Sequence, residues 1–331
     1  MSGERPRKIV RNLIGAAIIA CVAYFFLRAL RDNWDRLRAL EFEAHYAALA
    51  LTALSIAGSN LLGTAAWQAA MNTFAKRPLS FSESIATVNI SSLTKYVPGK
   101  VWAYALQMHR LSDAGVTKSM VLFANLASLA ISLATSTLVG LLCLGISSAQ
   151  GELRPLLLTA FLGLGAIYSL ATVFHAHPLR WLAQLLGRAF KRKFEYFSFD
   201  AAALLRLNAA HASAAVLSGF STYLACQGIG YAVTWDQAMT IMASGLIGDV
   251  VGFLAIVVPG GFGVREGVMW WLLRGATPGP VALILPIVSR LLSMGVELML
   301  GVIALALLKR LNRERISVPV GAPGSNDELG S

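Results

Sequence analysis

Two short motifs combine a Pro-Gly pair with ionisable side chains inside an otherwise apolar sequence. Residues 95–102 read KYVPGKVW, and residues 259–267 read PGGFGVREG. Proline removes a backbone donor, and an unpaired backbone polar group in hydrocarbon costs several kcal/mol, so a broken membrane helix persists only where protein or water satisfies it. Ionisable groups at membrane depth indicate function by default. These motifs are therefore the strongest candidates for a binding site.

The second motif could bind a phosphate group. Gly260, Gly261 and Gly263 let backbone N–H groups converge, and the residues from Val264 onwards are typical of a helix whose N-terminus faces that loop. Helix N-termini and glycine-rich loops bind anions, and Arg265 would add a planar pair of donors. We expect these four residues to hold an anionic lipid headgroup, with Pro259 as the structural break. The alternative is a tight helix break in which Arg265 and Glu266 pair elsewhere for structure.

The first motif offers two further cations. Lys95 and Lys100 flank the structural break at Pro98 and Gly99, with two aromatic side chains beside them. We expect both lysines to assist the binding of the headgroup. Lysine and aromatic side chains also gather at ordinary membrane surfaces, so surface anchoring is the alternative.

The C-terminal half carries more ionisable residues within its apolar segments. Arg290 and Glu297 are seven residues apart, so on a helix they share one face, which must point into the protein. Each needs a partner, and Asp249, Arg265 and Glu266 are the candidates. Together, Asp249, Glu266, Arg290 and Glu297 either form a buried structural ion network or couple charge or protons to a substrate.

The sequence offers little for enzyme chemistry. His175 and His177 have no third metal ligand nearby, and there is no P-loop, nucleophile elbow or dinucleotide-binding glycine pattern. His211, alone in an apolar run, is typical of a hydrogen-bonded packing residue. We therefore expect no catalytic residue, no metal ion and no cofactor.

Composition places these residues in a membrane. Hydrophobic residues make up 56% of the 331 positions, charged residues 14%, and mean hydropathy is +0.63. This composition predicts an all-α polytopic membrane protein. Apolar stretches near the roughly 20 residues that span a bilayer occur at 9–30, 46–72, 119–147, 155–174, 202–226, 236–258 and 280–308.

The net charge of +11 reports topology rather than a nucleic-acid partner, because the basic residues gather at the ends of apolar segments. Residues 5–11, 180–193 and 309–315 are basic, which predicts that all three regions and both termini are cytoplasmic. An even number of crossings between these regions requires residues 82–112 to return to the side they left, as a re-entrant hairpin or a surface element. It also requires residues 264–274 to complete a crossing, for about eight crossings in total.

The chain divides into two halves. Residues 1–316 form the expected transmembrane domain, with halves at 1–178 and 200–310, a basic linker at 179–199 and a disordered tail at 317–331. Each half holds one Pro-Gly break. Transporters often carry discontinuous helices in corresponding positions of two repeats, so a two-half pseudo-repeat is one interpretation.

Through these two motifs the chain resembles the flippase-like, lysylphosphatidylglycerol synthase transmembrane family, over about residues 9–310. The resemblance implies a multi-pass protein of the bacterial cytoplasmic (inner) membrane, with about eight spans and two re-entrant elements. In bifunctional relatives this region translocates aminoacylated phosphatidylglycerol, while a separate C-terminal domain attaches the amino acid. The sequence stops soon after its last span, so we expect that domain to be absent and the activity to be transport rather than catalysis.

The leading hypothesis is a lipid flippase or lipid-transport protein that moves an anionic-headgroup phospholipid or polyprenyl-linked amphiphile between leaflets. One alternative is a membrane-embedded lipid-modifying enzyme that uses Asp249 or Glu266 as a base. Another is a non-catalytic subunit of a lipid- or glycan-synthesis complex. Lipid, direction of movement, energy source and oligomeric state stay open at this point.

Overall fold

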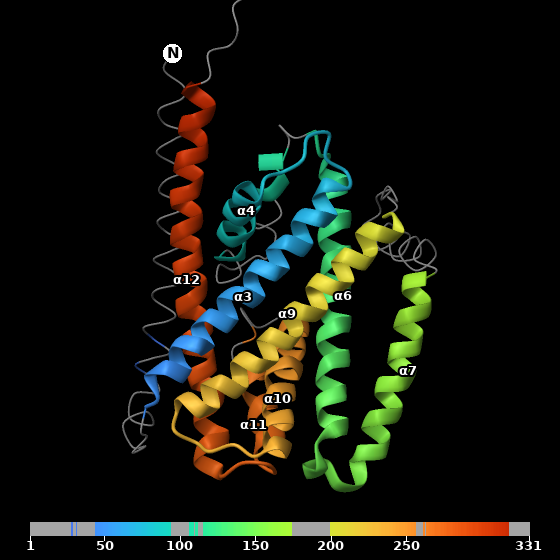
Figure 1. Cartoon of the computed structure of the whole chain (residues 1–331), viewed down its shortest axis with the longest axis vertical. Helices are drawn as coiled ribbons and strands as arrows, with labels where there is room; N and C mark the ends of the chain where they lie inside the picture. The colour runs from blue at the N-terminus through green and yellow to red at the C-terminus, as the bar shows by residue number, and fades with distance from the viewer. Residues whose placement is uncertain are drawn as a thin grey trace, which may run out of the picture.

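The computed structural model describes residues 28, 31, 44–93, 106–108, 110–111, 115–173, 199–255, 261 and 263–317. All regular secondary structure in these ranges is helical (Figure 1). The helices are α3 (Tyr46–Asn72), α4 (Phe81–Leu93), α6 (Lys118–Ile146), the 3-10 helix η3 (Ser148–Leu153), α7 (Arg154–Val173), α9 (Ala201–Gly228), α10 (Trp235–Leu254), α11 (Val264–Leu273) and α12 (Gly279–Ser317).

Six of the seven predicted apolar stretches each coincide with a helix, and most of their boundaries agree within a few residues. These helices are α3, α6, α7, α9, α10 and α12. The stretch at 9–30 lies outside the described residues except for Arg28. Within the described chain, five segments are long and apolar enough to cross a membrane: Tyr46–Asn72, Lys118–Ile146, Gly151–Leu170, Trp235–Leu254 and Gly279–Leu311. The chain is therefore a multi-pass helical membrane protein. Helix α9 is 28 residues long but is not among the five, because polar residues such as Asn208 and His211 interrupt its apolar sequence.

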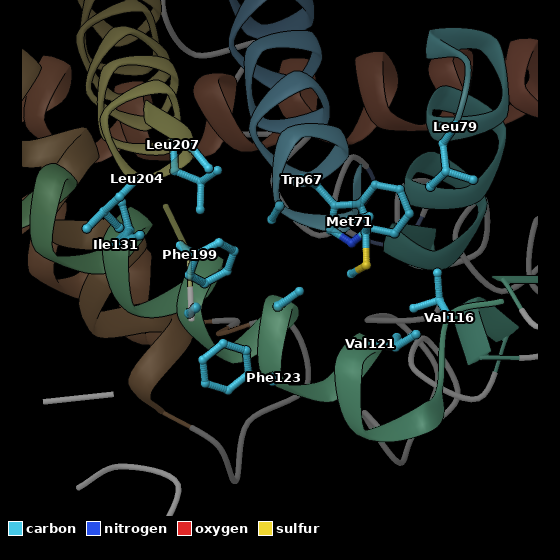
Figure 2. Close-up of a cluster of buried hydrophobic side chains, with 14 of the residues drawn as sticks. Trp67, Met71, Leu79, Val116, Val121, Phe123, Ile131, Phe199, Leu204 and Leu207 are labelled. Carbon is cyan, nitrogen blue, oxygen red and sulfur yellow. The ribbon is translucent and has the colours of Figure 1, made fainter. Parts of the chain in front are cut away.

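The helices form a bundle, and we call its two ends upper and lower as they appear in Figure 1. At the upper end, the ring of Phe199, just before α9, lies 5.7 Å from the ring of Phe123 in α6 and 5.2 Å from that of Phe74, just after α3. These rings belong to a buried cluster that includes Trp67, Met71 and Leu207 (Figure 2). The cluster therefore joins the end of α3 to the starts of α6 and α9.

At the lower end, hydrogen bonds to main-chain carbonyls join the other termini of these helices. The N–H of His45 donates to the Gly228 carbonyl at 3.0 Å, which places the start of α3 beside the end of α9. The hydroxyl of Ser147 donates to the Asp236 carbonyl at 3.1 Å, which places the end of α6 beside the start of α10. The chain leaves α7 and begins α9 at the upper end, and α12 also ends there (Figure 1).

Helix α11 runs back along α10. The amide of Gln237, near the start of α10, donates to the Ala276 carbonyl just after α11 at 3.0 Å, and Arg265 at the start of α11 pairs with Asp249 near the end of α10. The ten residues of α11 rise about 15 Å, half the roughly 30 Å of the hydrocarbon core, so this helix alone is too short for the crossing expected of residues 264–274. The pair α10–α11 instead begins and ends at the lower end, from which α12 starts (Figure 1).

One polar residue of the bundle core has the role predicted for it. His211 of α9 is buried, and its Nε2 lies 2.8 Å from the hydroxyl oxygen of Ser128 in α6, which is also buried. The prediction of a hydrogen-bonded packing residue is confirmed. A buried polar group of this kind avoids the cost of desolvation because it has a partner.

Candidate functional site

A polar cavity of about 230 Å³ lies inside the bundle. Residues of α3, α9, α10, α11 and α12 line it. Thr52 follows the first residue of α3 by six positions, and Glu297 follows the first residue of α12 by eighteen. At the rise of an α-helix, these lining residues lie roughly 9 Å and 27 Å along their helices from the lower end. The cavity therefore lies between the two ends of the bundle.

Four of the lining residues are charged, namely Asp249, Arg265, Arg290 and Glu297. The sequence placed Arg290 and Glu297 on one inward face of the last span, and both line the cavity from α12. Asp249 and Arg265 reach it from α10 and α11. The structure thus brings together residues that are up to 48 positions apart in the chain, from Asp249 to Glu297.

Arg265 is the most deeply placed of these charges, at 6% exposure. Its Nε donates to a carboxylate oxygen of Asp249, whose side chain is 48% exposed. Its Nη1 is also buried and has no hydrogen-bond partner among the described residues. A buried charged donor without a partner is costly, which makes Arg265, a residue of the cavity lining, a candidate for binding an anion.

Two glycines of α10 make room for Arg265. A Cβ at Gly252 would lie 3.0 Å from the Arg265 Cβ, and one at Gly248 would lie 3.2 Å from the Arg265 carbonyl oxygen and 2.7 Å from the Met269 side chain. A larger residue at either position would push α11 away from α10. The glycine spacing of α10 therefore sets how deeply Arg265 sits.

Glu266 binds the start of its own helix. One carboxylate oxygen accepts the Gly263 N–H at 2.7 Å, and the other lies 3.9 Å from the Nε of Arg290. Gly263 has φ +79 and Gly261 has φ +66, a region that favours glycine. The Gly263 N–H was expected to face a ligand, but it already donates to this side chain. The pairing of Glu266 with Arg290 was one of the expected outcomes.

The sequence analysis did not identify the uncharged polar lining. Hydroxyl and amide side chains make up most of it, from α3 (Thr52, Ser59, Asn60), α9 (Ser218, Ser221, Thr222) and α12 (Ser289, Ser293). In α9 and α12 these residues recur at three- or four-residue spacing, and in α3 Thr52 and Ser59 are seven residues apart, so in each helix they share one face. That period marks polar stripes in the sequence but does not say which stripes meet at a cavity.

Several predicted site residues lie outside the described residues, and their roles remain predictions: Lys95, Pro98, Gly99, Lys100, Pro259 and Gly260. The first motif follows α4 directly. Leu93, the last residue of α4, packs against α12 so closely that a Cβ at Gly301 would lie 2.5 Å from it.

Comparison with known proteins identifies one family. The model of the family described as Lysylphosphatidylglycerol synthase TM region matches residues 12–301. A search of curated proteins found no match.

Proposed function

The chain belongs to the lysylphosphatidylglycerol synthase TM region family, a membrane module linked to phospholipid modification, and on that basis we propose that it moves a lipid with an anionic phosphate headgroup between leaflets. The lipid is a phospholipid or a polyprenyl-linked amphiphile. The headgroup occupies the polar cavity, while the acyl or prenyl chains stay in the surrounding bilayer. Pockets for drug-sized molecules have volumes of about 300–1,000 Å³, so a cavity of about 230 Å³ suits a headgroup rather than a whole lipid.

The observation that supports this proposal most strongly is the buried Nη1 of Arg265, which lacks a hydrogen-bond partner among the described residues and belongs to a cavity-lining side chain. Arg290 lines the same cavity from the neighbouring helix. Guanidinium groups bind phosphate through parallel charge-assisted hydrogen bonds. A phosphate between these two arginines would pair with both guanidinium groups of the lining.

The remaining predicted residues have supporting roles in this proposal. Gly260, Gly261 and Gly263 would contact the headgroup before the start of α11, and Lys95 and Lys100 would assist its binding. Asp249, Glu266 and Glu297 balance the positive charge of the arginines. The two broken elements would let the cavity open alternately to each side.

The proposed activity has a direct test in proteoliposomes. Purified protein should speed the exchange of acyl-chain-labelled phosphatidylglycerol between leaflets, measured as the fraction of label that external dithionite can reduce. Chemical modification of the lipid in the same vesicles would identify an enzyme instead. Inactivity of the purified protein combined with co-purification of a lipid- or glycan-synthesis enzyme would identify a supporting subunit.

We also propose a location in the bacterial cytoplasmic membrane with the upper end of the bundle facing the cytoplasm. In a cysteine-free background, Arg313→Cys and a cysteine in the 180–193 region should escape a membrane-impermeant maleimide added to intact cells, and so should one near residue 7. Trp235→Cys, exposed at the lower end, is the matched positive control. External labelling of Arg313→Cys would reverse the orientation.

Neutralising Glu266 should strengthen the binding of an anionic headgroup. In Glu266→Gln an amide oxygen can still accept the Gly263 N–H, so the start of α11 should be kept, but the negative charge beside Arg290 is lost. That charge would repel the phosphate, so its removal should tighten phospholipid binding. Titration of the purified wild type and variant with phosphatidylglycerol checks this, and weaker binding by a well-folded variant would contradict it.

A further inference from the structure

Most of the seven hydroxyl groups that line the cavity share one hydrogen-bonding pattern. Five of them lie 2.7–3.0 Å from a main-chain carbonyl oxygen of their own or a neighbouring helix, namely Thr52, Ser59, Ser221, Ser289 and Ser293. A carbonyl oxygen can only accept, so in each pair the hydroxyl must donate. A hydroxyl has one hydrogen, so each of these five has no donor left for a ligand. Its lone pairs remain available.

The lining residues therefore separate into hydrogen-bond donors and hydrogen-bond acceptors. Two guanidinium groups supply the strong donors, whereas the five hydroxyl oxygens and the carboxylates of Asp249 and Glu297 supply acceptors. The amide of Asn60 differs, because one of its two N–H groups donates to the Ile56 carbonyl at 2.9 Å and the other remains as a neutral donor beside the acceptor oxygen. A phosphate accepts hydrogen bonds and does not donate them when ionised. It can satisfy the guanidinium groups, but it cannot satisfy the hydroxyl oxygens.

We propose that the cavity selects lipids whose headgroup carries hydrogen-bond donors, as hydroxyl or ammonium groups, within a few bonds of the phosphate. This inference rests on the proposed function and adds its specificity. The phosphate contacts Arg265 and Arg290, and the donor end of the headgroup contacts the hydroxyl oxygens of α3, α9 and α12. A headgroup without donors would fill the same space but leave those buried acceptors unmet, which is the unfavourable outcome.

Four lipids with identical acyl chains separate donor capacity from net charge. Phosphatidylglycerol has hydroxyl donors and phosphatidylmethanol has none, and both are anions. Phosphatidylethanolamine has ammonium donors and phosphatidylcholine has none, and both are zwitterions. Binding of each lipid to the full-length purified protein in neutral detergent is measured by native mass spectrometry over a lipid titration.

Within each charge class the donor-bearing lipid should bind roughly tenfold more tightly, the effect of one or two net hydrogen bonds. The two pairs also distinguish hydroxyl from ammonium donors as the preferred group. Equal affinity within both pairs would overturn the inference while leaving the proposed function intact. Failure of all four lipids to bind would remove both the proposed function and the inference.

Substitutions of cavity-lining serines test which residues cause the selectivity for donor-bearing headgroups. Ser221→Ala and Ser293→Ala each remove one acceptor and should shift the ratio of phosphatidylethanolamine to phosphatidylcholine affinity towards one, with little change for phosphatidylcholine itself. Ser244→Ala is the matched control, because this buried hydroxyl also donates to a carbonyl three residues earlier, at 2.8 Å, but does not line the cavity. An unchanged ratio in both lining variants would assign the selectivity elsewhere and contradict the inference.

Discussion

Arg265→Ala is expected to reduce phospholipid binding and leaflet-to-leaflet transfer by roughly ten- to a hundredfold, because hydrogen bonds to a charged group contribute about 1.5–3 kcal/mol. The substitution removes both the pairing with Asp249 and a guanidinium group of the cavity lining. The protein should still fold, because the carboxylate left behind at Asp249 is 48% exposed and can be solvated. Arg265→Lys should recover only part of the activity, because lysine lacks the planar pair of donors.

The measurement is binding by titration and transfer in proteoliposomes, with thermal unfolding as the check on folding. Arg274→Ala is the matched control. Arg274 lies at the end of the same helix, its guanidinium sits 5.6 Å from the rings of Trp270 and Trp271, and it does not line the cavity. Full transfer by a well-folded Arg265→Ala protein would remove the phosphate site and leave Arg265 with a structural role only.

Gly248→Val is expected to lower the stability of the protein by about 1–3 kcal/mol, the usual cost of overpacking, and to weaken lipid binding at the same time. A Cβ at this position would meet the Met269 side chain at 2.7 Å and the main-chain oxygen of Arg265 at 3.2 Å. The side chain can shift, but the main chain of α11 cannot move without carrying Arg265 with it. The substitution therefore displaces Arg265 from its place in the lining, although residue 248 itself does not line the cavity.

Gly267→Ala is the control for this variant. This variant adds a Cβ to a glycine of α11, and no atom would lie within 4 Å of that Cβ. It should therefore leave the site unaffected and raise helix stability by at most about 1 kcal/mol. Thermal unfolding in detergent and phospholipid titration of both variants make the comparison. Wild-type stability and binding in Gly248→Val would contradict the close packing of α11 on α10.

Some features of this protein follow from local sequence. The positions of α3, α6, α7, α10 and α12 could be predicted because a bilayer demands about 20 apolar residues per crossing and a helix satisfies its own backbone hydrogen bonds. The inward orientation of Arg290 and Glu297 followed from the same reasoning, since a charge on a spanning helix must avoid lipid. These inferences need only the period of a helix and the thickness of the membrane.

The site itself depended on the tertiary structure. The sequence offered Asp249, Arg265 and Glu266 as possible partners for Arg290 and Glu297, but only the antiparallel packing of α11 on the glycines of α10 decided that Arg265 pairs with Asp249 and Glu266 with Arg290. The bond from the Gly263 N–H to Glu266 is different, because it joins residues three positions apart at a helix start and could have been predicted from local sequence.

The hydroxyl lining was hidden for a related reason. A serine in a membrane helix has the same local pattern whether it faces lipid, a neighbouring helix or a cavity, because it can always donate to a carbonyl one turn back. Only the crossing of α3, α9 and α12 around one space brings Ser59, Ser221 and Ser293 together. The sequence by itself determined which segments span the membrane and which charges must avoid lipid. The tertiary structure determined which of those groups meet, because contacts between distant segments depend on packing rather than on local period.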